Sequence, residues 1–228
     1  MEREKPKDLG KLRADLDINP GEFYCEQGVS QEEVRRILNE ARGMPDDFVL
    51  STPEETYGNA TPSFSDDLIQ GYELFRDRIY SPKRVLYPSC DLDASPVKAF
   101  PESYVVLVDI NEHVVNALKR GGINAVHSDI RNYVPEEKFD LAILLNPCID
   151  SSDITPFLSE RAYVLANDWH ENARQLVWNP DFESIGTIEQ IPRKIDKDRW
   201  GHKFHLISGE MKDLGRVADN FWIFRSRK

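Results

Sequence analysis

The fold is indicated first by residues 84–111, which read RVLYPSCDLDASPVKAFPESYVVLVDIN. Two short apolar runs, Val85 to Tyr87 and Tyr104 to Val108, flank a polar turn and a segment that opens with Ser95 and Pro96. Runs this uniformly apolar predict strands that are buried on both faces, as in a parallel sheet. Ser95 and Pro96 predict the N-cap and the first residue of a helix between these strands. The stretch therefore predicts one strand, crossover and strand unit of an α/β fold.

The same alternation continues toward the C-terminus. A helix is expected from Asn111, its N-cap, to Arg120, with Gly121 ending it, and crossovers are expected around 153–160 and 171–178. The remaining segments expected to be strands are 125–126, 141–145, 162–166, 185–191, 204–207 and 221–224. The last three segments are rich in β-forming residues, and no strong helical pattern lies between the last two, which predicts an antiparallel edge. We expect a three-layer α/β/α sandwich, doubly wound around a mostly parallel sheet.

The first 83 residues predict a helical cap and an arm, and residues 84–228 a Rossmann-like domain. One helix is signalled by Ser30, whose spacing to Glu33 makes a capping box, and a second by Ser65 before an acidic pair. The segment between them, 44–64, is rich in turn residues but contains aromatics. It is either a lid over a binding site or a plain connecting loop.

Composition limits the partners and the compartment. The formal charge is −11 and the pI is near 5.0, which disfavours binding to a polynucleotide backbone. The longest apolar runs are far shorter than the roughly 20 residues that span a bilayer. Cys25, Cys90 and Cys148 are too few and too widely spaced for a disulfide framework or a CxxC metal site, and the His202 and His205 pair is a weak metal signal. We expect a cytoplasmic protein without a metal, acting on a small molecule or a protein.

The residues that close the predicted strands are polar and meet at one edge of the sheet. Ligands of open parallel sheets bind at this carboxyl edge. Asp109 follows the second strand about 20 residues after the first, where a carboxylate can accept both hydroxyls of a ribose. Asp109 could also be only the cap of the next helix, and Asp129, after the third strand, could be only a turn former.

In this order of elements the chain resembles the class I S-adenosylmethionine-dependent methyltransferases, over roughly residues 84–225. The resemblance implies S-adenosylmethionine as the cofactor, with Asp109 and Ile110 at the ribose end and Asp129 with the neighbouring amide of Ile130 facing the adenine. Asn146, at the end of the fourth strand, is implied to lie beside the transferred methyl group. An antiparallel last strand is also typical of the family.

One departure from the family concerns the turn after the first strand. The family has glycines there, because the chain must turn tightly and its backbone must approach the cofactor. This chain has no glycine between Arg84 and Gly121. Asp91 or Asp93 can bind the cofactor's ammonium group, but side chains could instead fill the loop and remove the site. The residues expected to contact the cofactor in this turn are Pro88, Ser89, Asp91 and Asp93.

Candidate catalytic residues follow the fourth and fifth strands. Asn146 and the proline after it resemble the start of the Asn-Pro-Pro-aromatic motif of amine-methylating members, although Cys148 and Ile149 replace its second half. An ordinary turn is the alternative. His170, near Asp168, is the histidine best placed as a general base, and a surface histidine is its alternative.

Three classes of function remain open from the sequence. The first is a methyltransferase that transfers a methyl group in line to a small molecule or a protein. The second is a binding or scaffold module that keeps the fold without catalysis, which the missing glycines favour. The third is a nicotinamide-dependent oxidoreductase, which the absence of a GxGxxG motif disfavours.

Overall fold

The structure is a computed structural model, and it describes residues 56–145, 149–167, 172–194, 200–208 and 221–228. Within strands β6 and β7, the backbone of residues 191–194 and 200–203 is described without the side chains. The predicted helix at Ser30 lies outside the described residues. The helices are α5 (Asp66–Arg78), α6 (Ser95–Ala99), α7 (Glu112–Arg120), η1 (Ile130–Asn132), α8 (Ser151–Ile154), η2 (Thr155–Phe157) and α9 (Asn172–Trp178).

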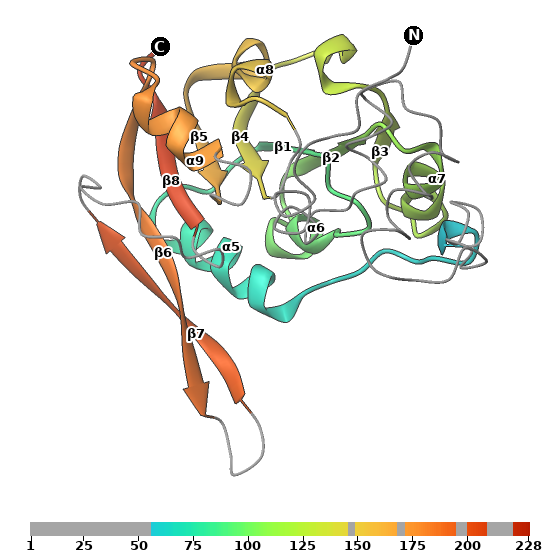
Figure 1. Cartoon of the computed structure of the whole chain (residues 1–228), viewed down its shortest axis with the longest axis horizontal. Helices are drawn as coiled ribbons and strands as arrows, with labels where there is room; N and C mark the ends of the chain where they lie inside the picture. Colours follow the sequence, from blue (N-terminus) through green and yellow to red (C-terminus); the bar gives the residue numbers. More distant parts are fainter. Residues whose placement is uncertain (1–55, 146–148, 168–171, 195–199, 209–220) are drawn as a thin grey trace, which may run out of the picture. The chain divides into compact units, whose positions relative to one another are not determined.

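The strands form one eight-stranded sheet in the order β3-β2-β1-β4-β5-β8-β6-β7 (Figure 1). Strands β1 to β5 pair in parallel, whereas β8 is antiparallel to both β5 and β6. The final strand is thus inserted antiparallel near the far edge, as the resemblance implied. The strands are β1 (Arg84–Pro88), β2 (Tyr104–Asp109), β3 (Ala125–His127), β4 (Phe139–Leu144), β5 (Leu158–Ala166), β6 (Phe182–Lys194), β7 (Trp200–Ser208) and β8 (Phe221–Ser226).

Two apolar layers cover the two faces of the sheet. Alternate residues of β1 point to opposite faces, so Val85 and Tyr87 join one core cluster and Leu86 joins the other. Helices α5, α6 and α7 contribute to the first cluster, and α8, η2 and α9 to the second. The predicted three-layer α/β/α fold and its antiparallel edge are therefore confirmed.

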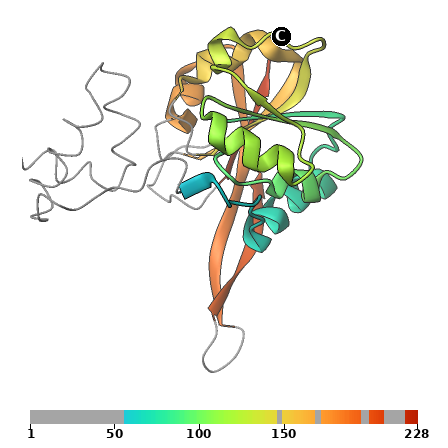
Figure 2. The same cartoon turned by 90° about the vertical axis from the view of Figure 1, so that its right-hand side faces the viewer.

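The β6–β7 hairpin extends beyond the helical layers (Figures 1 and 2). Near its base Gln190 lies opposite Phe204, and nearer its end Arg193 lies opposite Gly201. No helix among the described residues is long and apolar enough to cross a membrane.

Two local predictions differ from the structure. Ser95 is the first residue of α6 and not its N-cap, because Ala94 caps the helix and the Asp93 side chain accepts the Ser95 N–H. The expected crossover at 153–160 is shorter than predicted, since β5 already begins at Leu158. Helices α5 and α7 begin after Ser65 and Asn111 as predicted, and both side chains accept backbone N–H groups.

Residues 53–228 form one compact unit, which includes α5. The predicted division of the chain into residues 1–83 and 84–228 stays a prediction, because residues 1–55 lie outside the described part.

Gly71 lets α5 pack closely against the antiparallel part of the sheet. A Cβ at this position would lie 2.4 Å from Cε2 of Phe221 and 3.3 Å from Cε1 of Phe204. Phe221 is buried and its ring stacks on Tyr72 and Phe204, so it has little room to move. Glycine is required at position 71 because the α5 backbone lies close to the Phe221 ring, and not because its backbone conformation is unusual.

We predict that Gly71→Ala lowers the free energy of unfolding by about 1–3 kcal/mol, because the added methyl group overpacks this contact. Alanine favours a helix by about 1 kcal/mol over glycine, so the steric effect is expected to dominate. Urea denaturation measures the change. The control is Gln70→Ala at the exposed neighbouring position, which is expected to change stability by less than about 0.5 kcal/mol. A stabilised Gly71→Ala variant would contradict the packing account.

Candidate functional site

The candidate site lies at the carboxyl ends of β1, β2 and β3. Strand β1 lies between β2 and β4, so the chain order reverses on either side of it. Ligands of open α/β sheets bind at this reversal. The backbone N–H of Ser89, just after β1, donates to the carbonyl of Val108 in β2 (2.8 Å). Likewise Ser128, after β3, donates to the carbonyl of Asp109 (3.0 Å). The three strand ends are therefore held together by their backbones.

The turn after β1 adopts glycine-like backbone conformations without glycine. Ser89 has φ 50° and Asp91 has φ 48°, both in the left-handed region. Aspartate visits this region more readily than most residues, whereas serine has no such preference. The turn that the resemblance implied is thus made, but with a Cβ at each of these positions.

Asp93 is bound within the turn and not directed at a ligand. Its Oδ2 accepts the Tyr87 hydroxyl (3.0 Å), and its Oδ1 accepts both the backbone N–H (2.9 Å) and the hydroxyl of Ser95. Burial raises the pKa of this carboxyl group, and the hydrogen bonds from Ser95 and Tyr87 oppose the rise. Of the two aspartates predicted to bind an ammonium group, Asp93 therefore has most of its acceptor capacity occupied.

Asp91 is the exposed carboxylate of the turn. Within the described part of the chain its side chain has no hydrogen-bond or ion-pair partner. Its backbone N–H donates to Oδ2 of Asp109 (3.1 Å), so the turn after β1 and the end of β2 are joined at this residue.

Asp109 is buried, with 8% of its surface exposed. Its two carboxylate oxygens accept one backbone N–H each, from Asp91 and from Asn111 (2.9 Å). Burial raises the pKa of Asp109, and the two N–H donors oppose the rise. A carboxylate offers about four acceptor positions, so it keeps capacity for two further donors such as ribose hydroxyls. Asp109 also accepts the N–H of Asn111, the N-cap residue of α7, so Asn111 and not Asp109 caps the helix.

Ile110 and Ile130 lie differently although both follow an aspartate at this edge. Ile110 is 65% exposed, an unusual position for a large apolar side chain, and offers an apolar surface next to Asp109. The Ile130 side chain is buried in the core, which leaves its backbone at the edge.

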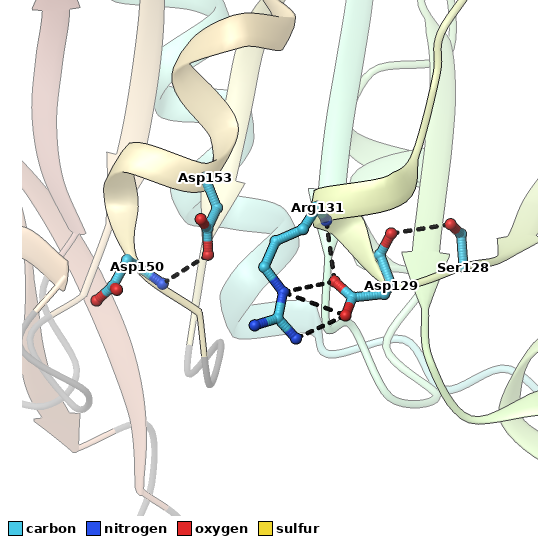
Figure 3. Close-up of polar contacts among 5 residues, drawn as sticks. All are labelled: Ser128, Asp129, Arg131, Asp150 and Asp153. Carbon is cyan, nitrogen blue, oxygen red and sulfur yellow. Dashed lines mark hydrogen bonds and ion pairs between the residues drawn. The ribbon is translucent and has the colours of Figure 1, made fainter. Parts of the chain in front are cut away.

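Asp129 forms an ion pair that the sequence analysis did not identify (Figure 3). The Arg131 guanidinium reaches both carboxylate oxygens, at 2.6 Å from Nη2 to Oδ2 and 3.0 Å from Nε to Oδ1. This contact lowers the pKa of Asp129. Figure 3 shows Arg131 between Asp129 and the start of α8, where Asp150 and Asp153 form a capping box. A ligand amine that used Asp129 would share it with Arg131.

A strap formed by residues 57–65 was also missed, because no local sequence pattern marks it. Ser63 donates its N–H to the carbonyl of Leu92 (2.8 Å) and accepts the N–H of Ala94 (2.9 Å). Pro62 lies against Gly121, where a Cβ would approach its Cγ to 2.3 Å. The end of the predicted loop at 44–64 therefore runs beside the turn after β1, whereas its first part lies outside the described residues.

Several predicted residues lie outside the described part of the chain. The three predicted catalytic residues Asn146, Asp168 and His170 are among them, and they stay predictions. Cys148 also lies outside the described residues. Cys90 itself is buried, and its burial, together with the charge of Asp109, raises the pKa of its thiol.

Within the described ranges no three His, Cys, Asp or Glu side chains gather where they could hold a metal ion.

The strand order is that of a Rossmann-like α/β fold whose last strand lies antiparallel between β5 and β6. No model of a protein family matches the sequence, and no curated protein matches it.

Solved structures that are similar to this chain include methyltransferases of low sequence identity. The N-methyltransferase NodS from Bradyrhizobium japonicum, in complex with S-adenosylhomocysteine, is 13% identical with a TM-score of 0.47, over 78% of this chain and 94% of that chain. The plantazolicin methyltransferase BpumL is 9% identical with a TM-score of 0.46, over 96% and 99%. An amino pentose methyltransferase from Micromonospora echinaspora is 10% identical with a TM-score of 0.45, over 80% and 99%.

We predict that Ser89→Gly raises the free energy of unfolding by about 0.5–1 kcal/mol. Glycine removes a left-handed strain of roughly 1–2 kcal/mol, and the greater entropy of its unfolded chain offsets part of the gain. Ser89→Ala keeps the Cβ and is the matched control. Urea denaturation of both variants measures the difference, and equal stabilities would show that the φ of Ser89 carries no strain.

We predict a pH-dependent difference in stability between the wild type and Asp109→Asn. Because burial raises the pKa of folded Asp109 above 3.8, the folded state takes up a proton at a higher pH than the unfolded state does. The wild type is therefore expected to gain stability relative to the variant as pH falls from 7 toward 3.8. Unfolding followed across this range checks the sign. A difference that is constant, or that moves against the wild type, would contradict the burial of this charge.

Proposed function

We propose that the protein binds S-adenosylmethionine at the carboxyl edge of the sheet and transfers its methyl group to a small molecule or a protein. The observation that carries the proposal is the pair of a buried Asp109, with two acceptor positions left, and an exposed Ile110 beside it. A nucleoside needs both an acceptor for its ribose hydroxyls and an apolar surface for its base. The fold alone would not suffice, since one fold hosts many functions.

Each residue has a distinct task in this proposal. Asp109 accepts the ribose hydroxyls, and Ile110 packs against the adenosine. The exposed carboxylate of Asp91 accepts from the ammonium group of the methionine part. When bound, S-adenosylmethionine supplies a methyl group on a sulfonium centre, which the acceptor attacks in line. The protein then contributes position and exclusion of water.

The acceptor side of the site is assigned from topology. Strand β4 is adjacent to β1 and β5 is adjacent to β4, and all three are parallel, so the carboxyl ends of β4 and β5 lie at the same edge of the sheet as that of β1. We assign Asn146 to the orientation of the acceptor, and Asp168 and His170 to proton removal.

Calorimetric titration of the full chain with S-adenosylmethionine, S-adenosylhomocysteine and NAD tests the proposal. We expect the first two to bind with dissociation constants on the order of micromolar. Asp109→Ala is expected to weaken both about 10- to 100-fold, because it removes hydrogen bonds to a charged acceptor. Glu112→Ala, an exposed neighbour at the start of α7, is the matched control and is expected to bind like the wild type.

The other outcomes separate the competing functions. A heat of binding with NAD, and with neither of the other two ligands, would favour the oxidoreductase function. A folded protein that binds none of the three ligands would favour a scaffold module, and the methyltransferase proposal would then be wrong.

A further inference from the structure

The turn after β1 is fixed on both sides of its two left-handed residues. On the N-terminal side, the N–H of Ser89 is held by Val108, and the N–H of Asp91 is held by Asp109. On the C-terminal side, the Asp93 carboxylate accepts from Tyr87 and twice from Ser95. Tyr87 belongs to the buried part of β1, so Asp93 ties the turn back to the strand from which it leaves.

The strap extends this network beyond the turn. The Ser95 hydroxyl that donates to Asp93 also accepts the N–H of Ser65 (2.9 Å) at the cap of α5. The backbones of Leu92 and Ala94, which flank Asp93, both bond Ser63. Asp93 is therefore the residue at which β1, α6 and the strap meet.

This network of hydrogen bonds stabilises the left-handed backbone conformation that glycine adopts without strain in other proteins. Non-glycine residues stay in the left-handed region only where their surroundings determine the backbone conformation from several sides. With Ser89 and Asp91 both left-handed, the turn needs restraints that a glycine turn does not need. The hydrogen bonds of Asp93 are charge-assisted and partly shielded from water, which makes them strong restraints.

We propose that Asp93 is a positioning residue for the turn after β1 and does not itself touch the cofactor. It holds Asp91 in place and, through the Asp91 N–H, the carboxylate of Asp109. The inference rests on the proposed function. It chooses between the two alternatives that the sequence left open, with Asp91 as the direct partner of the ammonium group and Asp93 as its support.

Two ligands separate support from direct contact. S-adenosylhomocysteine contains the amino acid part, whereas 5′-methylthioadenosine contains the nucleoside without it. A residue that binds only the ammonium group affects only the first ligand. A residue that positions the turn affects both, because Asp109 is bonded to the N–H of Asp91 at 3.1 Å.

The experiment is calorimetric titration of both ligands into the full chain and its variants. Asp93→Asn is expected to weaken both ligands by a similar factor of about ten, and Tyr87→Phe, which removes one donor only, by a smaller but again equal factor. Asp91→Asn is expected to weaken S-adenosylhomocysteine about tenfold and to leave 5′-methylthioadenosine unchanged.

The chain contains a matched control at the opposite edge of the sheet. The Asp140 carboxylate accepts the Tyr80 hydroxyl (3.1 Å) and the N–H groups of Lys83 and Arg84 (both 2.9 Å). This network resembles that of Asp93 in its donors but is not connected to the turn. Asp140→Asn is expected to lower stability without changing the affinity for either ligand.

Three outcomes would decide against the proposal. If Asp93→Asn weakens S-adenosylhomocysteine alone, Asp93 is a direct ligand. If it weakens neither while the wild type binds both, the turn does not depend on Asp93, and the proposed function stands without this inference. If the wild type binds neither ligand, the proposed function fails and the inference falls with it. Should Asp93→Asn not fold, the equal effect of Tyr87→Phe on both ligands is the deciding measurement.

Discussion

The hydrogen bonds of the Asp93 carboxylate are the constraint on which the candidate site depends. Without glycine, the chain leaves β1 through two left-handed residues, and this conformation persists only with restraints from outside the turn. Tyr87 and Ser95 supply these restraints through Asp93, and the strap supplies others through Leu92 and Ala94. The position of Asp91 follows from them, and the Asp91 N–H in turn helps to orient the Asp109 carboxylate.

The buried carboxylates show how charge can be kept at this edge. Burial raises the pKa of both Asp93 and Asp109, so each ionised group depends on the N–H and O–H groups directed at it. Asp129 differs, because its charge is balanced by Arg131 at the surface. The carboxyl edge thus holds three carboxylates with different roles. Asp93 supports the turn, Asp109 keeps acceptor capacity for a ligand, and Asp129 is paired with Arg131.

Local patterns in the sequence predicted most of the fold and only part of the site. The strands and the caps at Ser65 and Asn111 follow from residues adjacent in sequence, and the antiparallel last strand was implied by the family resemblance. The role of Asp93 could not be predicted from the sequence. Its partner Tyr87 looks like an ordinary apolar strand residue until the strand direction and the course of the turn are both known. The strap was missed for the same reason, since its bonds to Leu92 and Ala94 come from the backbone and carry no sequence signal.

A crystal structure of the full chain with S-adenosylhomocysteine tests the central claim most directly. The account predicts the ribose hydroxyls within hydrogen-bond distance of Asp109, the ammonium group at Asp91 and Asp93 still bonded to Tyr87 and Ser95. Ser89 and Asp91 are predicted to keep a positive φ. A ligand bound elsewhere, or a turn that rearranges so that Asp93 contacts the ligand, would contradict the account.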